Sequence, residues 1–353
     1  MESNAYRDQL FHPWEYPRET PATERGRRSA ERGRLSPSAD RRASTIEALH
    51  SSLLMPELPE VETIANGVDR RVRGDTIVSA WFSKHKEPFK TPASTLAAAL
   101  PAHSILRVHR VGKHIVIDLE PARTPRQSGS RRNTGLQNMQ SSHREASTPG
   151  QPGPQSQLVV HLGMTGRLLV TAPDLPEPSH THAVLTLASG RELRFVDPRR
   201  FGRLALNTAE AFAGPGREPL TISSGDFAQL FRGRRLAIKA ALLNQSLLHG
   251  VGNIYADESL FRAGIRPTRA AGRLTRVRLD RLLQSLRTVL KAAIRAGGSS
   301  VSDYVDADGE AGFFQIQHRV YGREGQPCRV CGRPIRRIII GGRSTHFCPR
   351  CQT

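Results

Sequence analysis

Four cysteines near the C-terminal end constrain the fold of this chain more than any other feature. They form two pairs, "CRVC" at 328–331 and "CPRC" at 348–351, with 16 residues between the pairs. The spacing C-x2-C-x16-C-x2-C is typical of a structural zinc site, in which each pair places two thiolates on one turn. Because "RRIII" and "RSTHF" flank Gly341 and Gly342, we expect a β-hairpin between the pairs. We therefore expect one structural Zn²⁺ as the only cofactor, held by Cys328, Cys331, Cys348 and Cys351 with no open position for water.

The charge of the chain indicates a polyanionic partner. The 353 residues include 52 Lys and Arg, 46 of them Arg, against 32 Asp and Glu, for a formal net charge of +20. An arginine-biased genome would raise the number of surface arginines without shifting the net charge this far, so nucleic acid is the expected partner. The zinc motif leaves no cysteine for a disulfide, which fits a reducing cytoplasm. We see no apolar run of about 18 residues and no signal peptide, so we expect no membrane partner.

Composition divides the chain into four segments. Residues 1–54 are rich in Arg, Ser, Glu and Pro without a clear hydrophobic period, which predicts a disordered extension. Residues 55–207 hold short β-like runs that predict a β-sandwich with flanking helices, interrupted by a polar, disordered insertion at 121–157. Residues 208–316 are helical in pattern, and 317–353 form the zinc finger. The predicted fold class is α+β.

The predicted elements follow from hydrophobic period and turn residues. The strands are expected at 76–82, 104–110, 114–120, 157–163, 167–172, 182–187, 191–196 and 203–207, and the helices at 59–72, 223–234, 236–245, 253–264 and 275–298.

The stretch "MPELPEVET", from Met55 to Thr63, reads like the start of a protein. If Met55 is the initiator and is removed, Pro56 presents a free secondary amine, and α-amines have a pKa of about 7.7–8. Such an amine can attack C1′ of a deoxyribose and form an iminium. Glu57 and Glu60 would lie within one helical turn of it and could move protons. A Pro-plus-Glu helix start would explain these nine residues equally well, so the stretch alone leaves both interpretations open.

This stretch resembles the amino terminus of the bacterial formamidopyrimidine-DNA glycosylases, repair enzymes that remove 8-oxoguanine and ring-opened purines. The resemblance runs from Met55 to Thr353 and includes "HLGMTGRL" at 161–168, "DPRRFG" at 197–202 and "GVGNIYADESLFRAGI" at 250–265. It implies that Met55 is the true start, so that residues 1–54 are an overextended gene assignment or are removed. It also implies a helix-two-turn-helix in the second domain.

The resemblance implies a set of catalytic residues. Pro56 matches the Schiff-base nucleophile, Glu57 the proton donor and acceptor at the sugar, and Glu60 a second carboxylate near the amine. Lys113, in "RVGKH", matches the lysine of the β-elimination step, although a strand-end lysine would look the same by itself. Arg343, on the zinc hairpin, matches the arginine of δ-elimination.

The resemblance also implies how DNA is held. A flipped base leaves a gap in the duplex, and Met164, Arg199 and Phe201 match the residues that fill it; without the resemblance, Met164 and Phe201 would more often be core residues. The expected phosphate contacts are His180, Arg200, Arg235, Lys239, Asn253 and Arg343. Gly250 and Gly252 would let backbone N–H groups approach a phosphate at a helix N-terminus. Residues 297–314 match a mobile loop that closes over the everted base.

The expected function is a bifunctional DNA glycosylase and AP lyase. It would act as a cytoplasmic, nucleoid-associated monomer, excise oxidised purines from damaged double-stranded DNA and cut the strand by β,δ-elimination. One rival is the endonuclease VIII branch, which prefers oxidised pyrimidines and lacks the Met/Arg/Phe set. Two others are a damage-binding protein whose amine is blocked by residues 1–54, and a zinc-ribbon module that binds nucleic acid without catalysis.

Overall fold

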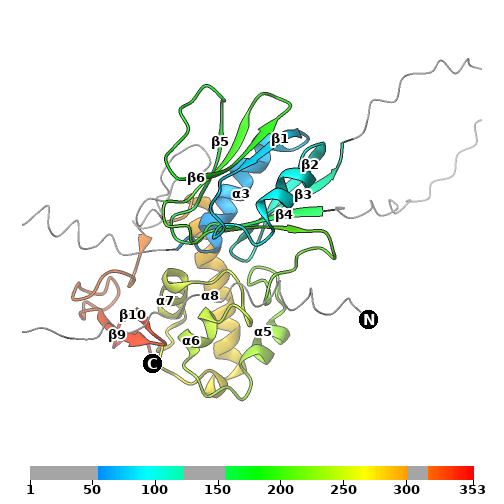
Figure 1. The fold of residues 1–353 in the computed structure, drawn as a ribbon. Helices are drawn as coiled ribbons and strands as arrows, with labels where there is room; N and C mark the ends of the chain where they lie inside the picture. Colours follow the sequence, from blue (N-terminus) through cyan, green and yellow to red (C-terminus); the bar gives the residue numbers. More distant parts are fainter. Residues whose placement is uncertain (1–54, 123–155, 300–316) are drawn as a thin grey trace, which may run out of the picture. The chain divides into compact units, whose positions relative to one another are not determined.

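The computed structural model describes residues 55–122, 156–299 and 317–353. The predicted extension at 1–54, most of the insertion and most of the 297–314 loop lie outside these ranges. Within them the α+β class is confirmed: a β-sheet with helices, a helical domain and a two-stranded C-terminal hairpin (Figure 1). Among the described residues, no helix is long and apolar enough to cross a membrane. The predicted domain boundaries at 207 and 316 stay predictions.

Eight antiparallel strands form one hydrogen-bonded sheet in the order β5-β7-β6-β1-β2-β3-β4-β8. In chain order they are β1 (Thr76–Phe82), β2 (His103–Val111), β3 (His114–Pro121), β4 (Ser156–His161), β5 (Arg167–Thr171), β6 (Thr181–Leu187), β7 (Glu192–Val196) and β8 (Arg203–Asn207). Only two register pairs, Thr76 with Ser104 and Ile77 with His103, join β1 to β2. Side chains from both sides of this short junction enter one hydrophobic cluster, among them Phe195 and Ile117, as expected for a β-sandwich.

The edges of the predicted insertion are wrong at both ends. Strand β3 continues through Pro121, which pairs with His103, and β4 begins at Ser156, which pairs with Leu119. Proline is acceptable at a strand end because a ladder donor is not required of it there. Strand β4 stops at His161, two residues before the predicted end at 163, because Gly163 turns the chain with φ +66°.

Helix α3 (Leu58–Val72) completes the core of the sandwich. Its buried residues Val61, Ile64, Ala65 and Val68 recur at helical spacing and join the same hydrophobic cluster as the strands. The predicted start at Pro59 is one residue late: Leu58 is the first helical residue, and Glu57 is the N-cap. A short helix, α4 (Ala93–Ala99), was not predicted.

The second domain is helical, as predicted, and has its own core. It contains α5 (Ser224–Phe231), α6 (Ile238–Leu243), α7 (Asn253–Ala263), the 3₁₀ turn η1 (Ala271–Arg273) and α8 (Arg276–Arg295). Phe227, Tyr255 and Leu286 are fully buried in this core, and Leu58 from the start of α3 packs into it too. The residues that directly follow Glu57 are therefore built into two cores, Leu58 into this one and Val61 into that of the sandwich.

The C-terminal segment forms the predicted hairpin. Strand β9 (Arg336–Ile340) pairs with β10 (Arg343–Phe347), and both turn glycines, Gly341 and Gly342, have positive φ. The chain leading into this module is fixed by Glu258 of α7, whose buried carboxylate accepts the backbone N–H groups of Arg319, Val320 and Tyr321 at 2.8–3.0 Å.

Candidate active site and zinc centre

The first residues of α3 place the predicted catalytic carboxyls together. The backbone N–H of Glu57 donates to Oε2 of Glu60 at 2.9 Å, and the N–H of Leu58 donates to the carbonyl of Gly250 at 3.0 Å. The hydroxyl of Tyr255 donates to Oε1 of Glu60, and so does the N–H of Ser299 at 2.8 Å. Pro56, Glu57 and Glu60 are all buried. The chain bond to Met55 makes the Pro56 nitrogen a tertiary amide in this form of the protein.

The Glu57 carboxyl lies at the N-terminus of α7. Oε1 accepts the N–H of Ile254 at 3.2 Å, and Oε2 accepts that of Tyr255 at 3.5 Å. A Cβ on Gly252 would lie only 2.1 Å from Cδ of Glu57, so a glycine is required there. Anions are favoured at a helix N-terminus. The N–H groups of Ile254 and Tyr255 are therefore occupied by a protein carboxyl, and the predicted approach of a phosphate at Gly250 and Gly252 stays a prediction.

Burial brings the pKa of Glu57 close to neutral. Desolvation raises the pKa of Glu57 from 4.5 to about 7, against the opposing charge of Lys113 and with a contribution from the negative charge of Glu60. Desolvation also raises the pKa of Glu60, against the hydrogen bond from Tyr255. A carboxyl in this state can donate a proton and take it back at physiological pH.

Lys113 lies in the tight turn between β2 and β3. Gly112 has φ +62°, and a Cβ there would meet the ring of His249 at 3.0 Å. Buried Arg110 donates from Nη1 to the Gly112 carbonyl at 3.2 Å and to Glu218 at 2.9 Å, and from Nε to Glu62 at 2.6 Å. These contacts fix the turn, and Lys113 is half-buried within electrostatic range of Glu57.

The three predicted gap-filling residues sit on two turns that Asp197 joins. The Asp197 carboxylate accepts the N–H groups of Arg199 at 3.2 Å and Gly202 at 2.7 Å, and the Thr165 hydroxyl at 2.5 Å. Phe201 is 43% exposed, which is unusual for a large apolar side chain. The guanidinium of Arg199 lies 4.7 Å from the centre of its ring, and Met164 is half-buried.

Five of the six predicted phosphate contacts reach solvent, and one is fully buried. His180, Arg235 and Arg343 are exposed, Arg200 and Asn253 are half-buried, and His180 and Arg200 have positive φ. Arg200 donates to Nδ1 of His85 at 3.0 Å. Lys239, in contrast, is fully buried.

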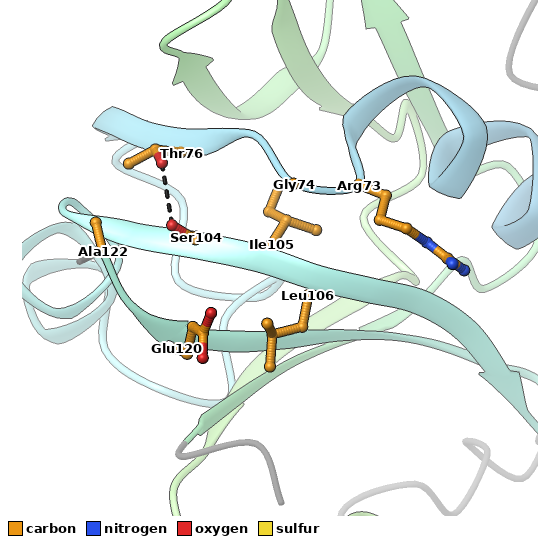
Figure 2. Close-up of a pocket in the computed structure, with 8 residues that line it drawn as sticks. All are labelled: Arg73, Gly74, Thr76, Ser104, Ile105, Leu106, Glu120 and Ala122. Carbon is orange, nitrogen blue, oxygen red and sulfur yellow. Dashed lines mark hydrogen bonds between the residues drawn. The ribbon is translucent and has the colours of Figure 1, made fainter. Parts of the chain in front are cut away.

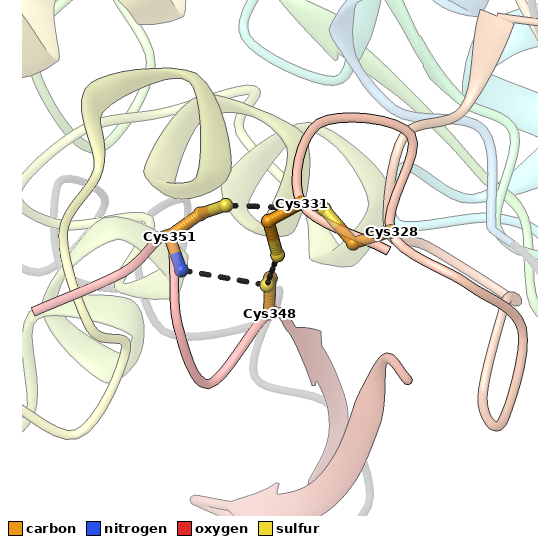
Figure 3. A group of neighbouring side chains, drawn as sticks. All are labelled: Cys328, Cys331, Cys348 and Cys351. Carbon is orange, nitrogen blue, oxygen red and sulfur yellow. Dashed lines mark hydrogen bonds between the residues drawn. The ribbon is translucent and has the colours of Figure 1, made fainter. Parts of the chain in front are cut away.

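The four cysteines form a structural zinc site (Figure 3). All four sulfur atoms lie within 4.8 Å of one another, with Cys328 to Cys351 at 3.9 Å and Cys331 to Cys348 at 3.4 Å. Tetrahedral coordination with Zn–S bonds of about 2.3 Å places sulfurs about 3.8 Å apart, so the residues fit the ion. The N–H groups of Val330 and Cys351 point to cysteine sulfurs at 3.5 and 3.4 Å, which stabilises thiolates.

One surface hollow of the described residues lies elsewhere. It has a volume of about 340 Å³ and contains none of the predicted site residues (Figure 2). Its lining comes from the β1–β2–β3 region and consists of Arg73, Gly74, Thr76, Ser104, Ile105, Leu106, Glu120 and Ala122. The candidate site is therefore defined by the Glu57 cluster and not by this hollow.

Sequence reasoning missed several residues on which the site depends. Tyr255, Asp257 and Glu258 in "NIYADESL" and Asp197 in "DPRRFG" lie inside stretches that had been singled out. The sequence offered one signal for these residues: each is a charged or hydroxyl-bearing side chain next to apolar positions of the core. Some of their partners are distant in sequence: Tyr255 bonds to Glu60 across 195 residues, and Asp197 to Thr165 across 32.

Three sequence profiles match the chain in order. They are the formamidopyrimidine-DNA glycosylase N-terminal domain over 55–204, the H2TH domain of the same enzymes over 215–305, and the zinc finger found in FPG and IleRS over 325–353. The chain belongs to the formamidopyrimidine-DNA glycosylase family. The match begins at residue 55.

Known members of the family are similar over their whole length. The formamidopyrimidine-DNA glycosylase of Thioalkalivibrio sulfidiphilus is 42% identical over 306 residues, covering 84% of this chain and 100% of that protein. The MutM (Fpg) structure from Thermus thermophilus is 38% identical with a TM-score of 0.67, covering 84% and 98%. A Lactococcus lactis Fpg variant bound to DNA containing Fapy-dG is 29% identical with a TM-score of 0.70, covering 84% and 100%.

Proposed function

We propose that this DNA glycosylase excises oxidised purines from duplex DNA and then cuts the strand by β,δ-elimination through an iminium on Pro56. The observation that carries the proposal is the Glu57 carboxyl. It adjoins Pro56, is buried, and has a pKa of about 7, so it can hold a proton beside the nucleophile at neutral pH. The identity of the family supports the lesion class.

Base excision uses Pro56 and Glu57. The lone pair of the free Pro56 amine attacks C1′ of the damaged nucleotide while Glu57 donates its proton to the ring oxygen O4′. The sugar ring opens, the Pro56 nitrogen gives up its proton to the base, and the C1′–N bond to the base breaks as the base leaves in neutral form. The product is an iminium between the Pro56 nitrogen and C1′. Glu60 keeps the Glu57 backbone in place through the 2.9 Å hydrogen bond.

Strand cleavage follows from the acidity that the iminium confers. Removal of a proton from C2′ lets the C3′–O bond break and releases the downstream strand with a 5′-phosphate; Lys113 is the residue for this β-elimination. Removal of a proton from C4′ then lets the C5′–O bond break and leaves a 3′-phosphate upstream; Arg343 is the residue for this δ-elimination. Hydrolysis of the remaining imine frees Pro56.

The proposed DNA contacts are the side chains of the candidate site that are exposed or half-buried. His180, Arg200, Arg235 and Arg343 would contact phosphates together with Asn253, and Met164, Arg199 and Phe201 would fill the gap left by the base. The side chains of Arg199 and Phe201 already lie together on an exposed turn. We propose that a monomer suffices, since all these residues come from one chain.

The amine chemistry requires a protein form that begins at Pro56. The family match from residue 55 supports this start. N-terminal sequencing of the protein from its native cells would check it, because a blocked Pro56 would leave a damage binder or a proenzyme.

The deciding experiment is borohydride trapping on duplex DNA with 8-oxoguanine opposite cytosine. The protein that begins at Pro56 should form a covalent adduct, and the full 353-residue chain should not. Pro56→Gly in the same short form should trap far more slowly while its DNA affinity stays within about threefold. Normal turnover by Pro56→Gly would refute the imine role.

A second substrate class needs the same test. One similar structure is Lactococcus lactis Fpg with a DNA that contains an oxidised pyrimidine. Excision of thymine glycol faster than 8-oxoguanine would favour the pyrimidine class. We expect the opposite order because of the Met164, Arg199 and Phe201 set.

A further inference from the structure

A buried ion pair lies beneath the zinc hairpin and outside the chemistry described above. Nζ of Lys239, on α6, lies 2.7 Å from Oδ1 of Asp257, on α7, and both side chains are 0% exposed. The sequence predicted Lys239 as a phosphate contact, but its ammonium faces the interior. Buried pairs are weak sources of net stability compared with apolar side chains of similar volume. We therefore look for the role of the Lys239–Asp257 pair in the positions that it fixes, not in the stability that it adds.

Both members of the pair hold strand β10. Nζ of Lys239 donates to the carbonyl of Ser344 at 2.6 Å, and the Asp257 carboxylate accepts the N–H of His346 at 2.8 Å. Asn253 adds a longer contact from Nδ2 to Oγ of Ser344 at 3.4 Å. These three hydrogen bonds attach Ser344 and His346, which follow closely after Arg343, to α6 and α7.

The zinc ion by itself cannot fix Arg343. The nearest zinc ligand along the chain is Cys348, which directly follows β10 and lies five residues after Arg343. In an extended strand, five residues span about 17 Å. A rotation of the hairpin by about 10° about its zinc end would then move Arg343 by about 3 Å, whereas misplacement of a catalytic group by about 1 Å can cost 100-fold in rate. A second point of attachment near Arg343 is needed.

We propose that Lys239 and Asp257 are positioning residues for Arg343, and that their contacts with Ser344 and His346 set its place for the δ-elimination step. This inference rests on the proposed function, in which Arg343 serves that step. The charges of Glu57 and Arg343 both act on Lys239, so the pair lies within electrostatic range of both side chains. Burial lowers the pKa of Lys239, and the adjacent Asp257 opposes that effect.

The test uses zinc-loaded protein that begins at Pro56 and a duplex with a preformed abasic site. Lys239→Met keeps the length of the side chain and removes the donor to Ser344. A denaturing gel separates the δ-product, which ends in a 3′-phosphate, from the β-product, which ends in an unsaturated aldehyde. We expect the rate of δ-product formation to fall at least tenfold, while borohydride trapping stays within about threefold and one zinc per chain is retained. Lys291→Met, an exposed lysine on α8, is the matched control and should behave as wild type.

Arg343→Ala separates failure of this inference from failure of the proposed function. If Arg343→Ala loses the δ-product and Lys239→Met does not, the positioning role is overturned and the proposed function stands. If Arg343→Ala keeps the δ-product, the role of Arg343 fails and the inference falls with it. Loss of zinc or a parallel loss of trapping in Lys239→Met would show a general structural role and would also overturn it.

Two further measurements complete the test. The double variant Lys239→Met/Asp257→Asn removes the carboxylate that the single change leaves unpaired, and it should show the same loss of δ-product in a stably folded chain. The dependence of DNA affinity on salt tests the original phosphate assignment. Each lost phosphate contact lowers the slope of log K against log salt by about 0.9, so an unchanged slope supports positioning and a drop of that size refutes it.

Discussion

Replacing Glu57 by Gln should make the enzyme more stable above neutral pH and remove its activity. Gln keeps the shape of the side chain, and its amide oxygen can still accept the N–H of Ile254, which Glu57 accepts at 3.2 Å. It cannot ionise, so it escapes the desolvation that raises the pKa of Glu57 to about 7. It also cannot donate a proton to the sugar, and loss of such a group typically costs a factor of about 100 to 10,000 in rate.

The magnitude follows from proton linkage. The folded chain holds the Glu57 proton up to about pH 7, whereas the unfolded chain releases it near 4.5. The folded state therefore binds more protons between these values, and the free energy of unfolding of the wild type falls as pH rises through this window. Between pH 5 and pH 8 the loss is about 2.5 kcal/mol. The stability advantage of Glu57→Gln over the wild type should grow by that amount over the same range.

Urea unfolding at pH 5, 6.5 and 8 measures this difference. The full 353-residue chain with saturating zinc is the right material, because a free amine at Pro56 would change the electrostatics around Glu57. Glu177→Gln, at an exposed position, is the control and should follow the wild type at every pH. An advantage for Glu57→Gln that is the same at pH 5 and pH 8 would refute the buried, proton-holding carboxyl.

Three other changes test separate parts of the site. Gly252→Ala should destabilise the folded chain and abolish base excision, because its Cβ would lie 2.1 Å from Cδ of Glu57; normal excision would show that Glu57 can leave α7 freely. Phe201→Ala should slow single-turnover excision of 8-oxoguanine about tenfold, since filling the vacated stack offsets a few kcal/mol, and should spare cleavage of preformed abasic sites; equal losses on both substrates would contradict a gap-filling role. Cys328→Ala should lose the zinc and weaken DNA binding at least tenfold in a titration, and full affinity would exclude the hairpin from the interface.

Local patterns were sufficient to predict much of the fold. Strand β1 was predicted from a short run of residues typical of strands, and the Gly341–Gly342 turn from glycines at positions that need positive φ. Helix α4 was missed because its "ASTLAAA" carries one buried leucine and so lacks an amphipathic period. The end of β3 was placed one residue early because Pro121 was taken as the start of the polar insertion, and the end of β4 was placed two residues late because Gly163 was taken as part of the strand.

Contacts between distant residues could not be predicted in this way. Glu57 was identified as a proton donor, but its position at α7 depends on amides 197 and 198 residues away. Lys239 lies in a short helix where a lone lysine usually faces solvent, and its burial depends on Asp257 in another helix and on Ser344 in the hairpin. Such positions are set by tertiary packing, which composition and spacing do not encode locally.

The attachment of Glu57 to α7 has a consequence for how the reactive amine is controlled. A prolyl amine can attack many aldehydes, and an exposed one on a partly folded chain could form adducts without regard to DNA. Here the carboxyl that would assist it reaches its place only when the first residues of α3 have docked on the helical domain, through Glu57 and through the Leu58 hydrogen bond to Gly250. In the proposed mechanism, the sandwich produced alone would carry the amine without the Glu57 carboxyl in place, so reactivity toward sugars would be delayed until both domains have assembled.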